Sequence, residues 1–252
     1  MKKIYYGLVF LTMITLNSCE KLFIDDTPGN ISGMGSNSGK LQIKETFILP
    51  KGIKLIDTIT EINIIDKSLP RFGSGSVHLK ISLLNYSDVA KTVYFPKGLI
   101  LKCNSPENHN LLLLQTCWIS MNPNGSKTIV LDAYSINLAR EDPDVSGLTY
   151  EITGLSDSKV INGLLDLISW KKINYEMIIG SDSDENTDSY LDIIYPIREL
   201  VWKLTDHGSE ITDEDKKFIK NIPELSASEI PPKDNLGQFP VYFDEVVVVK
   251  SN

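Results

Sequence analysis

The stretch Val77-His78-Leu79-Lys80-Ile81-Ser82-Leu83 alternates apolar and polar side chains at every position. This alternation places the apolar side chains on one face of an extended chain, so it predicts a half-buried β-strand. Other short β-prone runs surround this stretch, and turn-forming clusters such as Asn85-Tyr86-Ser87-Asp88 and Asn122-Pro123-Asn124-Gly125 separate them. Several short strands divided by turns favour an antiparallel β-sandwich over residues 41–153.

A helical pattern takes over in residues 154–225. Apolar side chains recur at helical spacing in residues 161–168 and again in residues 190–204, which predicts two helices with one apolar face each. Pro196 lies inside the second stripe and would cost about 3 kcal/mol in a helix interior, so that helix should start near the proline or kink at it. Residues 212–215 resemble a capping box that opens a third, short helix. We therefore expect a helical insertion or subdomain of about three helices.

Residues 226–252 begin as a proline-containing loop and end in β-prone sequence. Four consecutive valines, residues 246–249, would be an aggregation hazard if they stayed unpaired. We expect this run to return to the earlier sheet as a buried strand. The predicted fold class is therefore mainly β with a helical subdomain, an α+β protein.

The composition is that of a globular protein. The chain of 252 residues is 42% hydrophobic and 23% charged, which excludes collagen-like, coiled-coil and wholly disordered chains. Its three cysteines are too few for a disulfide-dense scaffold. The formal net charge of −8 argues against nucleic acid as a partner, because phosphate backbones attract basic proteins.

The first residues have the layout of an export signal. Lys2 and Lys3 precede an apolar segment over residues 4–16. That segment is shorter than the ~20 residues that span a bilayer, and its arrangement is typical of a secretory signal peptide, which we place at residues 1–18. Residues 25–40 are rich in Gly, Ser and Asn, a composition typical of a flexible linker.

The signal peptide ends in Leu16-Asn17-Ser18-Cys19, which resembles the lipobox of bacterial lipoproteins. The resemblance implies that the Cys19 thiol is lipidated and that the chain is cut before it; the alternative is a plain cleaved signal with an incidental cysteine. Residues 19–40 would then form a lipid-anchored flexible tether. The implied location is the cell envelope, at the outer membrane, in a periplasmic or surface-facing orientation. The wider chain is similar to uncharacterised lipoproteins of Bacteroidota-type bacteria.

Two further segments resemble the thioester domains of bacterial surface adhesins. They are Tyr134-Ser135-Ile136 and Arg198-Glu199-Leu200-Val201-Trp202. In that family a Cys and a Gln at the positions of Ser135 and Arg198 form an internal thioester that captures an amine. The resemblance therefore implies a shared fold, a β-sandwich with a helical part, in which the covalent chemistry is lost.

An acidic segment is the most metal-like part of the sequence. Oxygen-bearing side chains at every second position echo the first half of a calcium loop; these are Asp182, Asp184, Asn186 and Asp188. The match then fails, because Thr187 replaces the required Gly and Ile193 stands where a bidentate Glu is needed. The other interpretation is a solvated acidic loop before a helix, whose dipole favours carboxylates near its start.

The histidines and cysteines predict no cofactor. His78, His109 and His207 have no second His or Cys at metal-ligand spacing, so we expect no zinc, and we expect His78 at the surface. Cys103 and Cys117 would lie near each other in a hairpin but several residues out of register. We expect buried free thiols, and a disulfide stays open as the alternative.

The chain contains no nucleophile elbow, no phosphate-binding loop with a Lys and no His-Glu-x-x-His motif. We therefore expect a non-catalytic binding or adhesion-like module that contacts the membrane through its lipid and takes a protein or glycan ligand at the envelope. The alternative is an exported hydrolase that acts on glycan or envelope polymer through carboxylates that the sequence does not single out. A pocket with two acids, one of raised pKa, would favour the hydrolase.

Overall fold

The structure, a computed structural model, describes residues 26–63, 65–140, 147–179, 187–230 and 249–250. Its strands are β1 (Ile43–Thr46), β2 (Ile53–Leu55), β3 (Ile59–Glu61), β4 (Arg71–Gly73), β5 (Val77–Asn85), β6 (Lys91–Phe95), β7 (Leu99–Cys103), β8 (Leu111–Leu112), β9 (Cys117–Met121), β10 (Ser126–Ser135), β11 (Thr149–Ser156) and β12 (Val249–Lys250). Its helices are the 3-10 helix η1 (Leu138–Arg140) and the α-helices α2 (Lys159–Ile168), α3 (Tyr175–Ile178), α4 (Thr187–Thr205) and α5 (Asp213–Asn221).

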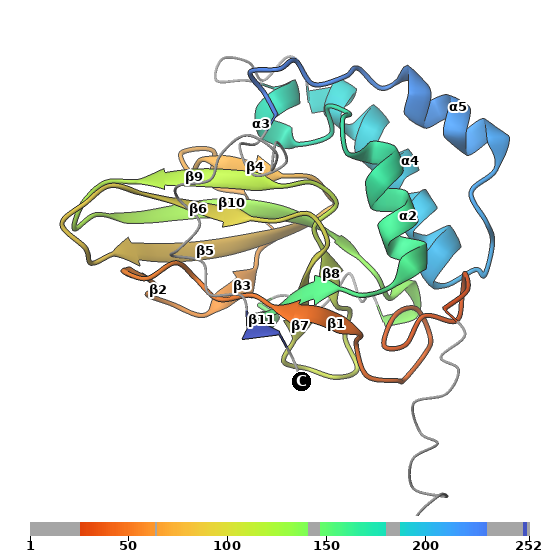
Figure 1. Ribbon diagram of the computed structural model, residues 1–252, viewed down its shortest axis with the longest axis horizontal. Helices are drawn as coiled ribbons and strands as arrows, with labels where there is room; N and C mark the ends of the chain where they lie inside the picture. Colours follow the sequence, from red (N-terminus) through yellow and green to blue (C-terminus); the bar gives the residue numbers. More distant parts are fainter. Residues whose placement is uncertain (1–25, 64, 141–146, 180–186, 231–248, 251–252) are drawn as a thin grey trace, which may run out of the picture.

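Six strands close into an antiparallel barrel (Figure 1). The order around it is β11-β3-β5-β10-β8-β7, and β7 pairs back to β11 from Leu99↔Leu155 to Cys103↔Tyr150. The prediction of a mainly β, α+β fold is confirmed, but the predicted sandwich is wrong. Both architectures bury one face of each strand, so alternation cannot distinguish them. The pairing of β7 with β11 closes the sheet and makes it a barrel.

The barrel interior is filled by the inward-facing residues of its strands. Leu79 and Ile81 of β5 lie directly opposite Leu131 and Ile129 of β10, and all four are fully buried. The alternation that predicts a strand at 77–83 thus marks the core face of β5. A separate two-stranded sheet, β6 with β9, adds apolar side chains such as Phe95 to the same core.

The helices cover the outer face of the barrel at one end (Figure 1). Outward-facing Ile100, Leu112 and Tyr134 share a second core with the apolar stripes of α2 and α4. On α2 the buried residues are Ile161, Leu164, Leu165 and Ile168, the stripe visible in the sequence. The protein therefore has two cores, one inside the barrel and one between the barrel and the helices.

Helix α4 begins at Thr187, earlier than the expected start near Pro196, and it includes the proline. The expected start near the proline neglected tertiary packing, while the alternative, a kink at Pro196, stays a prediction. Tyr190 before the proline and Ile197 and Val201 after it are all fully buried in the helix-covered core. Burial on both sides of Pro196 offsets the backbone hydrogen bond that proline cannot make.

The expected flexible tether, residues 19–40, is wrong for residues 26–40, which pack against the body of the protein. Ile31 and Met34 are fully buried in the helix-covered core. The amide of Gly35 donates to the carbonyl of Ile136 at 2.7 Å, and Asn137 Nδ2 donates to the carbonyl of Gly35 at 2.8 Å. Composition alone suggested a linker, whereas two apolar side chains among the small residues anchor the segment.

The last described residues form a short strand. β12 pairs antiparallel with β1, with Glu45 opposite Lys250 and Thr46 opposite Val249. The remainder of the predicted valine strand, residues 246–248, lies outside the described residues. Within the part of the chain that the structure describes, no helix is both long and apolar enough to cross a membrane.

Candidate functional site

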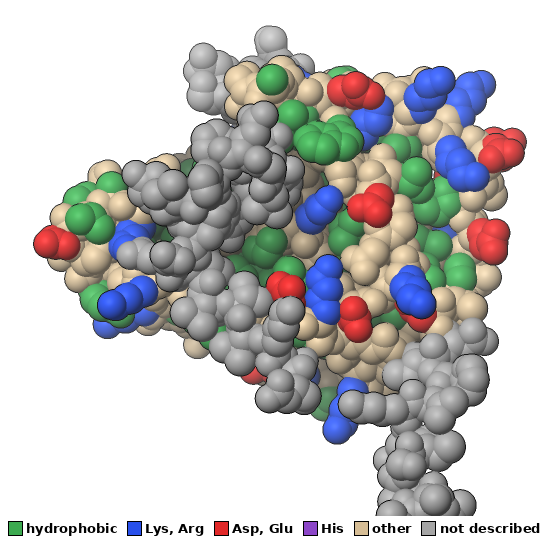
Figure 2. All heavy atoms as spheres, viewed as in Figure 1, with side chains coloured by type: hydrophobic (Ala, Val, Ile, Leu, Met, Phe, Trp, Pro, Cys, Tyr) green, Lys and Arg blue, Asp and Glu red, His purple; other side chains and the backbone are tan. Residues whose placement is uncertain are grey.

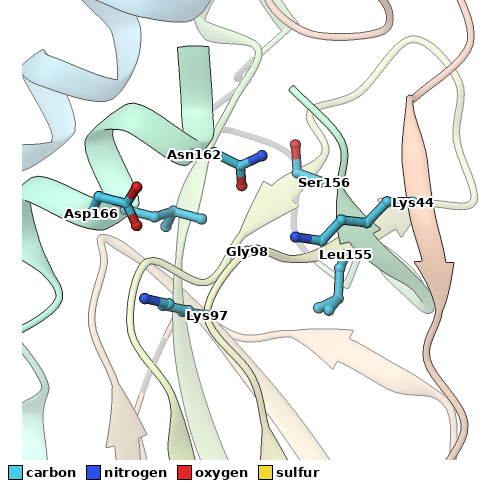
Figure 3. Close-up of a pocket in the computed structure, with 8 residues that line it drawn as sticks. Lys44, Lys97, Gly98, Leu155, Ser156, Asn162 and Asp166 are labelled. Carbon is cyan, nitrogen blue, oxygen red and sulfur yellow. The ribbon is translucent and has the colours of Figure 1, made fainter. Parts of the chain in front are cut away.

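An open pocket of about 280 Å³ lies where the barrel meets helix α2. Its walls come from β1, the turn before β7, the end of β11 and α2 (Figure 3). The lining residues are Lys44, Lys97, Gly98, Leu155, Ser156, Asn162, Leu165 and Asp166. Segments that lie far apart in the sequence therefore meet at this hollow.

Two lysines bring positive charge to the pocket. Lys44 is an exposed residue of β1, and its amine points into the pocket (Figure 3). Lys97 lies in the turn between β6 and β7, and its Nζ donates to Ser169 Oγ at 2.8 Å. Because Ser169 follows the last residue of α2, this bond connects the barrel turn to the helix that forms the opposite wall.

Helix α2 adds an amide and a carboxylate. Asn162 and Asp166 are four residues apart, so they lie on the same face one turn apart. The start of the helix is well defined, since Ser158 Oγ accepts from the amide of Ile161 at 3.1 Å. Asp26 accepts from Ser158 Oγ and from the amide that follows it. The two polar side chains are thus displayed from a capped helix.

The pocket has one more positive than negative charge, in a chain of net charge −8. Figure 2 shows Lys, Arg, Asp and Glu side chains interspersed over the junction of barrel and helices. Such a lining attracts a singly charged anion. Other polar groups of the same ligand could form hydrogen bonds with the donors and acceptors of the lining.

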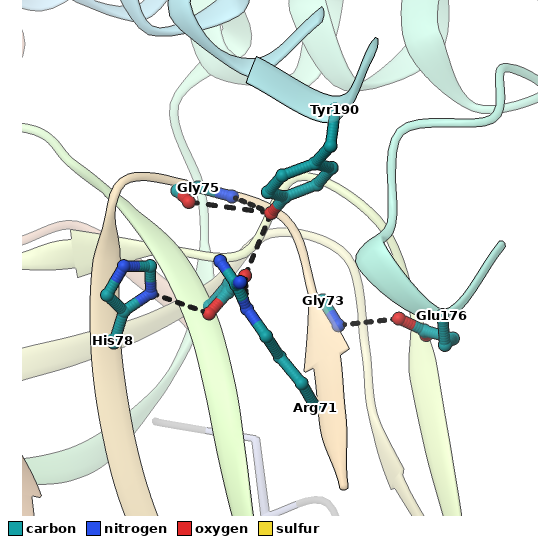
Figure 4. Close-up of polar contacts among 7 residues, drawn as sticks. Arg71, Gly73, Gly75, His78, Glu176 and Tyr190 are labelled. Carbon is teal, nitrogen blue, oxygen red and sulfur yellow. Dashed lines mark hydrogen bonds and ion pairs between the residues drawn. The ribbon is translucent and has the colours of Figure 1, made fainter. Parts of the chain in front are cut away.

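A second polar cluster is buried between the barrel and α3 and α4 (Figure 4). At its centre the carboxylate of Asp132 is fully buried on β10. Its Oδ2 accepts from Arg71 Nε at 2.7 Å and from the Tyr190 hydroxyl at 2.8 Å, and its Oδ1 accepts from His78 Nδ1 at 2.8 Å. His78, expected at the surface, is only partly so: its side chain is 21% exposed while it pairs with Asp132, which lies directly opposite on the neighbouring strand.

The cation of this cluster is enclosed by aromatic rings. The guanidinium of Arg71 lies 4.1 Å from the ring centre of Tyr175 and 5.2 Å from that of Tyr190. Such cation–π contacts stabilise a partly desolvated charge. Arg71 of β4 therefore joins the barrel to α3 and α4.

A second carboxyl lies near Asp132. Glu176 of α3 keeps some exposure as a residue, but its carboxyl group is enclosed: Oε2 accepts from the amide of Gly73 at 2.9 Å and Oε1 from Asn174 Nδ2 at 3.2 Å. Burial raises the pKa of Glu176 to about 8, and the charge of Asp132 acts in the same direction. At neutral pH this carboxyl is therefore mainly protonated.

A third cluster lies in the barrel core. The Tyr150 hydroxyl donates to Glu61 Oε2 at 2.7 Å and lies 2.9 Å from His109 Nε2. Burial acts to raise the pKa of Glu61, but hydrogen bonds from His109 and Tyr150 outweigh it and hold that pKa below its usual value. His109 is buried, and among the described residues its Nδ1 has no hydrogen-bond partner.

Several predicted site residues lie outside the described residues: Cys19, Asp182, Asp184 and Asn186. Of the acidic segment only Asp188 is described, and it lies exposed in the first turn of α4. Over the described ranges, no group of three or more His, Cys, Asp or Glu side chains could hold a metal ion. The calcium interpretation of residues 182–188 thus stays untested.

The two thioester-like positions do not bond to each other. Ser135 is fully buried at the end of β10, where its Oγ accepts from the amide of Asn137 at 3.4 Å. Arg198 lies on α4 with its guanidinium stacked on the rings of Tyr195 and Trp202. Both side chains therefore have roles in packing.

Both remaining thiols are free and buried. Cys103 belongs to barrel strand β7, whereas Cys117 belongs to β9 in the separate two-stranded sheet. Burial raises the pKa of each thiol, which keeps it protonated and unreactive.

Comparisons of the chain with known protein families, curated proteins and solved structures found no match. Sequence reasoning also missed every residue of the pocket, because none belongs to a motif. The one local signal, a Pro-Lys-Gly turn at residues 96–98, marks a bend in the chain and carries no information about a ligand.

Proposed function

We propose that this protein is a lipid-anchored binding protein of the bacterial cell envelope, whose folded head takes its ligand without converting it. The lipobox-like residues 16–19 support the anchor and the location. The observation that carries the binding role is the pocket of Lys44, Lys97, Asn162 and Asp166. These four side chains come from three separate segments and face one solvent-open hollow, an arrangement suited to holding a polar ligand.

The polar groups of the pocket are suited to recognition. Ammonium groups, an amide and one carboxylate supply charge and hydrogen bonds, but the lining has no Ser–His or Cys–His pair that would activate a nucleophile. Fixed polar groups beside the apolar side chains of Leu155 and Leu165 are typical of sites that orient a small ligand.

A specific observation keeps the hydrolase as the second candidate. Asp132 and Glu176 are two carboxyls of which one has a pKa raised to about 8, a pattern that can separate an acid from a base. Neither carboxyl lines the pocket, however, and Asp132 is fully buried with three donors. This pair is better explained as the contact that holds α3 and α4 on the barrel.

Binding and turnover can be separated in one experiment. The mature lipidated protein, in detergent micelles, is incubated with acidic and neutral oligosaccharides and with envelope proteins, and retained ligand and new reducing ends are both measured. We expect saturable retention of unaltered ligand. Release of new reducing ends in proportion to protein, abolished by Glu176→Gln but not by Glu210→Gln, would instead establish the hydrolase.

A further inference from the structure

We infer that the pocket at the junction of the barrel and α2 is a subsite for a carboxylated sugar, a hexuronate residue of an acidic glycan. This inference rests on the proposed binding function and names the ligand class of the same site. It is argued from three properties of the lining: its charge, its hydrogen-bonding groups and its apolar surface.

The two lysines favour a carboxylate. Lys44 points its amine into the pocket, and Lys97 is held at the pocket edge by its bond to Ser169. The carboxylate of Asp166 leaves the lining with one net positive charge, which a single carboxylate neutralises, whereas a dianionic phosphate would leave one negative charge uncompensated. The net charge of the whole chain, −8, adds to this preference for a singly charged group.

The helix favours hydroxyl groups next to that carboxylate. Asn162 and Asp166 lie one turn apart on α2 and together offer one amide donor and several oxygen acceptors. Neighbouring hydroxyls of a sugar ring both donate and accept hydrogen bonds, so they can satisfy this pair. A peptide carboxyl terminus has no such hydroxyl groups.

The remaining wall of the pocket is apolar. Leu155 and Leu165 present side chains to the pocket, and Gly98 has none. Gly98 has a φ of +80°, and a Cβ there would lie 3.1 Å from Leu165 Cδ1, so any larger residue would be strained and would crowd this wall. The C–H face of a sugar can lie against such a surface. Because the pocket opens to solvent, a longer glycan can extend from it.

The inference is tested by calorimetric titration of the mature lipidated protein in detergent micelles. The probes are trigalacturonate, trimannuronate and a hyaluronan tetrasaccharide, each compared with its methyl ester, which keeps the rings but removes the charge. We expect at least one acid to bind and its ester to bind about tenfold more weakly, a change of about 1.4 kcal/mol. Lys44→Ala and Lys97→Met should each weaken binding of the acid about fivefold or more. Asp166→Ala should weaken the ester more than the acid, because it removes a hydrogen-bond acceptor for both probes but also a negative charge that repels the acid.

Lys217→Ala is the matched control, because it removes an exposed lysine of α5 outside the pocket and should leave binding unchanged. Thermal melting of each variant checks that it folds. Equal binding of acid and ester, or unchanged binding by both lysine variants, overturns the inference. Binding of a peptide with a free carboxyl terminus in place of every uronate also overturns it, while leaving the binding function intact. Retention of no oligosaccharide or envelope protein at all contradicts the proposed function itself.

Discussion

At the scale of single residues, the burial of the Asp132 carboxylate carries a large desolvation cost. A fully buried carboxylate loses several kcal/mol of hydration unless donors replace the water. Here the donors come from three different elements: Arg71 of β4, His78 of β5 and Tyr190 of α4. The carboxylate therefore holds α4 on the barrel, and each donor should matter to stability.

Tyr190→Phe removes a hydroxyl that donates to Asp132 and accepts from the amide of Gly75 at 3.2 Å. The variant leaves buried polar atoms short of a partner, so we expect a loss of about 1–3 kcal/mol in the free energy of unfolding. Urea titration measures it. Tyr195→Phe on the same helix is the control, because Tyr195 is 45% exposed, and it should be neutral. Equal stability of the two variants would show that the Tyr190 hydroxyl does not support Asp132.

Glu176 makes stability depend on pH. Its pKa is raised from the usual 4.5 to about 8, so between these values the folded protein keeps a proton that the unfolded chain has lost. Stability must therefore fall as the pH rises through this window, by at most about 1.4 kcal/mol per pH unit. Glu176→Gln stays neutral, and we expect it to melt higher than the parent protein at pH 8 but close to it at pH 5.

The pH profile of thermal melting checks this expectation. Glu210→Gln is the matched control, since Glu210 is exposed, and it should follow the parent protein at both pH values. A difference between Glu176→Gln and the parent that is as large at pH 5 as at pH 8 would contradict the assignment of a protonated Glu176.

At the scale of elements, the start of α2 is stabilised by Asp26, a residue that precedes the barrel strands in the sequence. A helix leaves its first amides without partners. Here Ser158 caps one of them, and Asp26 accepts both from Ser158 Oγ and from the amide of Lys159. The negative charge of Asp26 also complements the positive end of the helix dipole. Residues 26–40 are thus part of the fold, and the pocket wall depends on them.

Asp26→Ala should lower the free energy of unfolding by about 1 kcal/mol, the usual loss for a missing N-terminal cap. Chemical denaturation measures it, and Asp57→Ala, which removes an exposed carboxylate elsewhere, should be neutral. If the two variants are equally stable, Asp26 does not support the start of α2.

At the scale of the whole molecule, the proposed anchor and the folded head have separate physical origins. The head buries its apolar side chains in two cores. Attachment would depend on acyl chains at Cys19, because each buried CH₂ contributes about 0.8 kcal/mol and two or more chains are needed for stable anchoring. The chain has no excess of basic residues that could hold an anionic membrane instead.

Cys19→Ala should move the protein from the membrane pellet to the soluble fraction and remove its fatty acid. Fractionation and mass spectrometry of the purified N-terminus measure both effects. Cys103→Ala removes a buried barrel thiol, and this control should stay in the pellet with its lipid. A Cys19→Ala protein that still pellets would contradict the lipoprotein assignment.

Local patterns in the sequence were enough to place several of the strands and helices. Alternation at residues 77–83 marks β5, the stripe at 161–168 marks α2, and the capping box at 212–215 opens α5, where Thr212 and Asp215 bond reciprocally. These features are predictable because each depends on residues only a few positions apart. The mainly β, α+β class follows from the same patterns.

Tertiary contacts decided the rest. Closure of the barrel depends on β7 meeting β11, the packing of residues 26–40 depends on the helices, and the pocket assembles Lys44, Lys97 and Asp166 from three segments. No periodicity along the chain predicts these long-range contacts, because they depend on how the surfaces of the formed strands and helices pack together. The donors of Asp132 were equally invisible, since a carboxylate in a strand looks solvent-facing until a helix covers it.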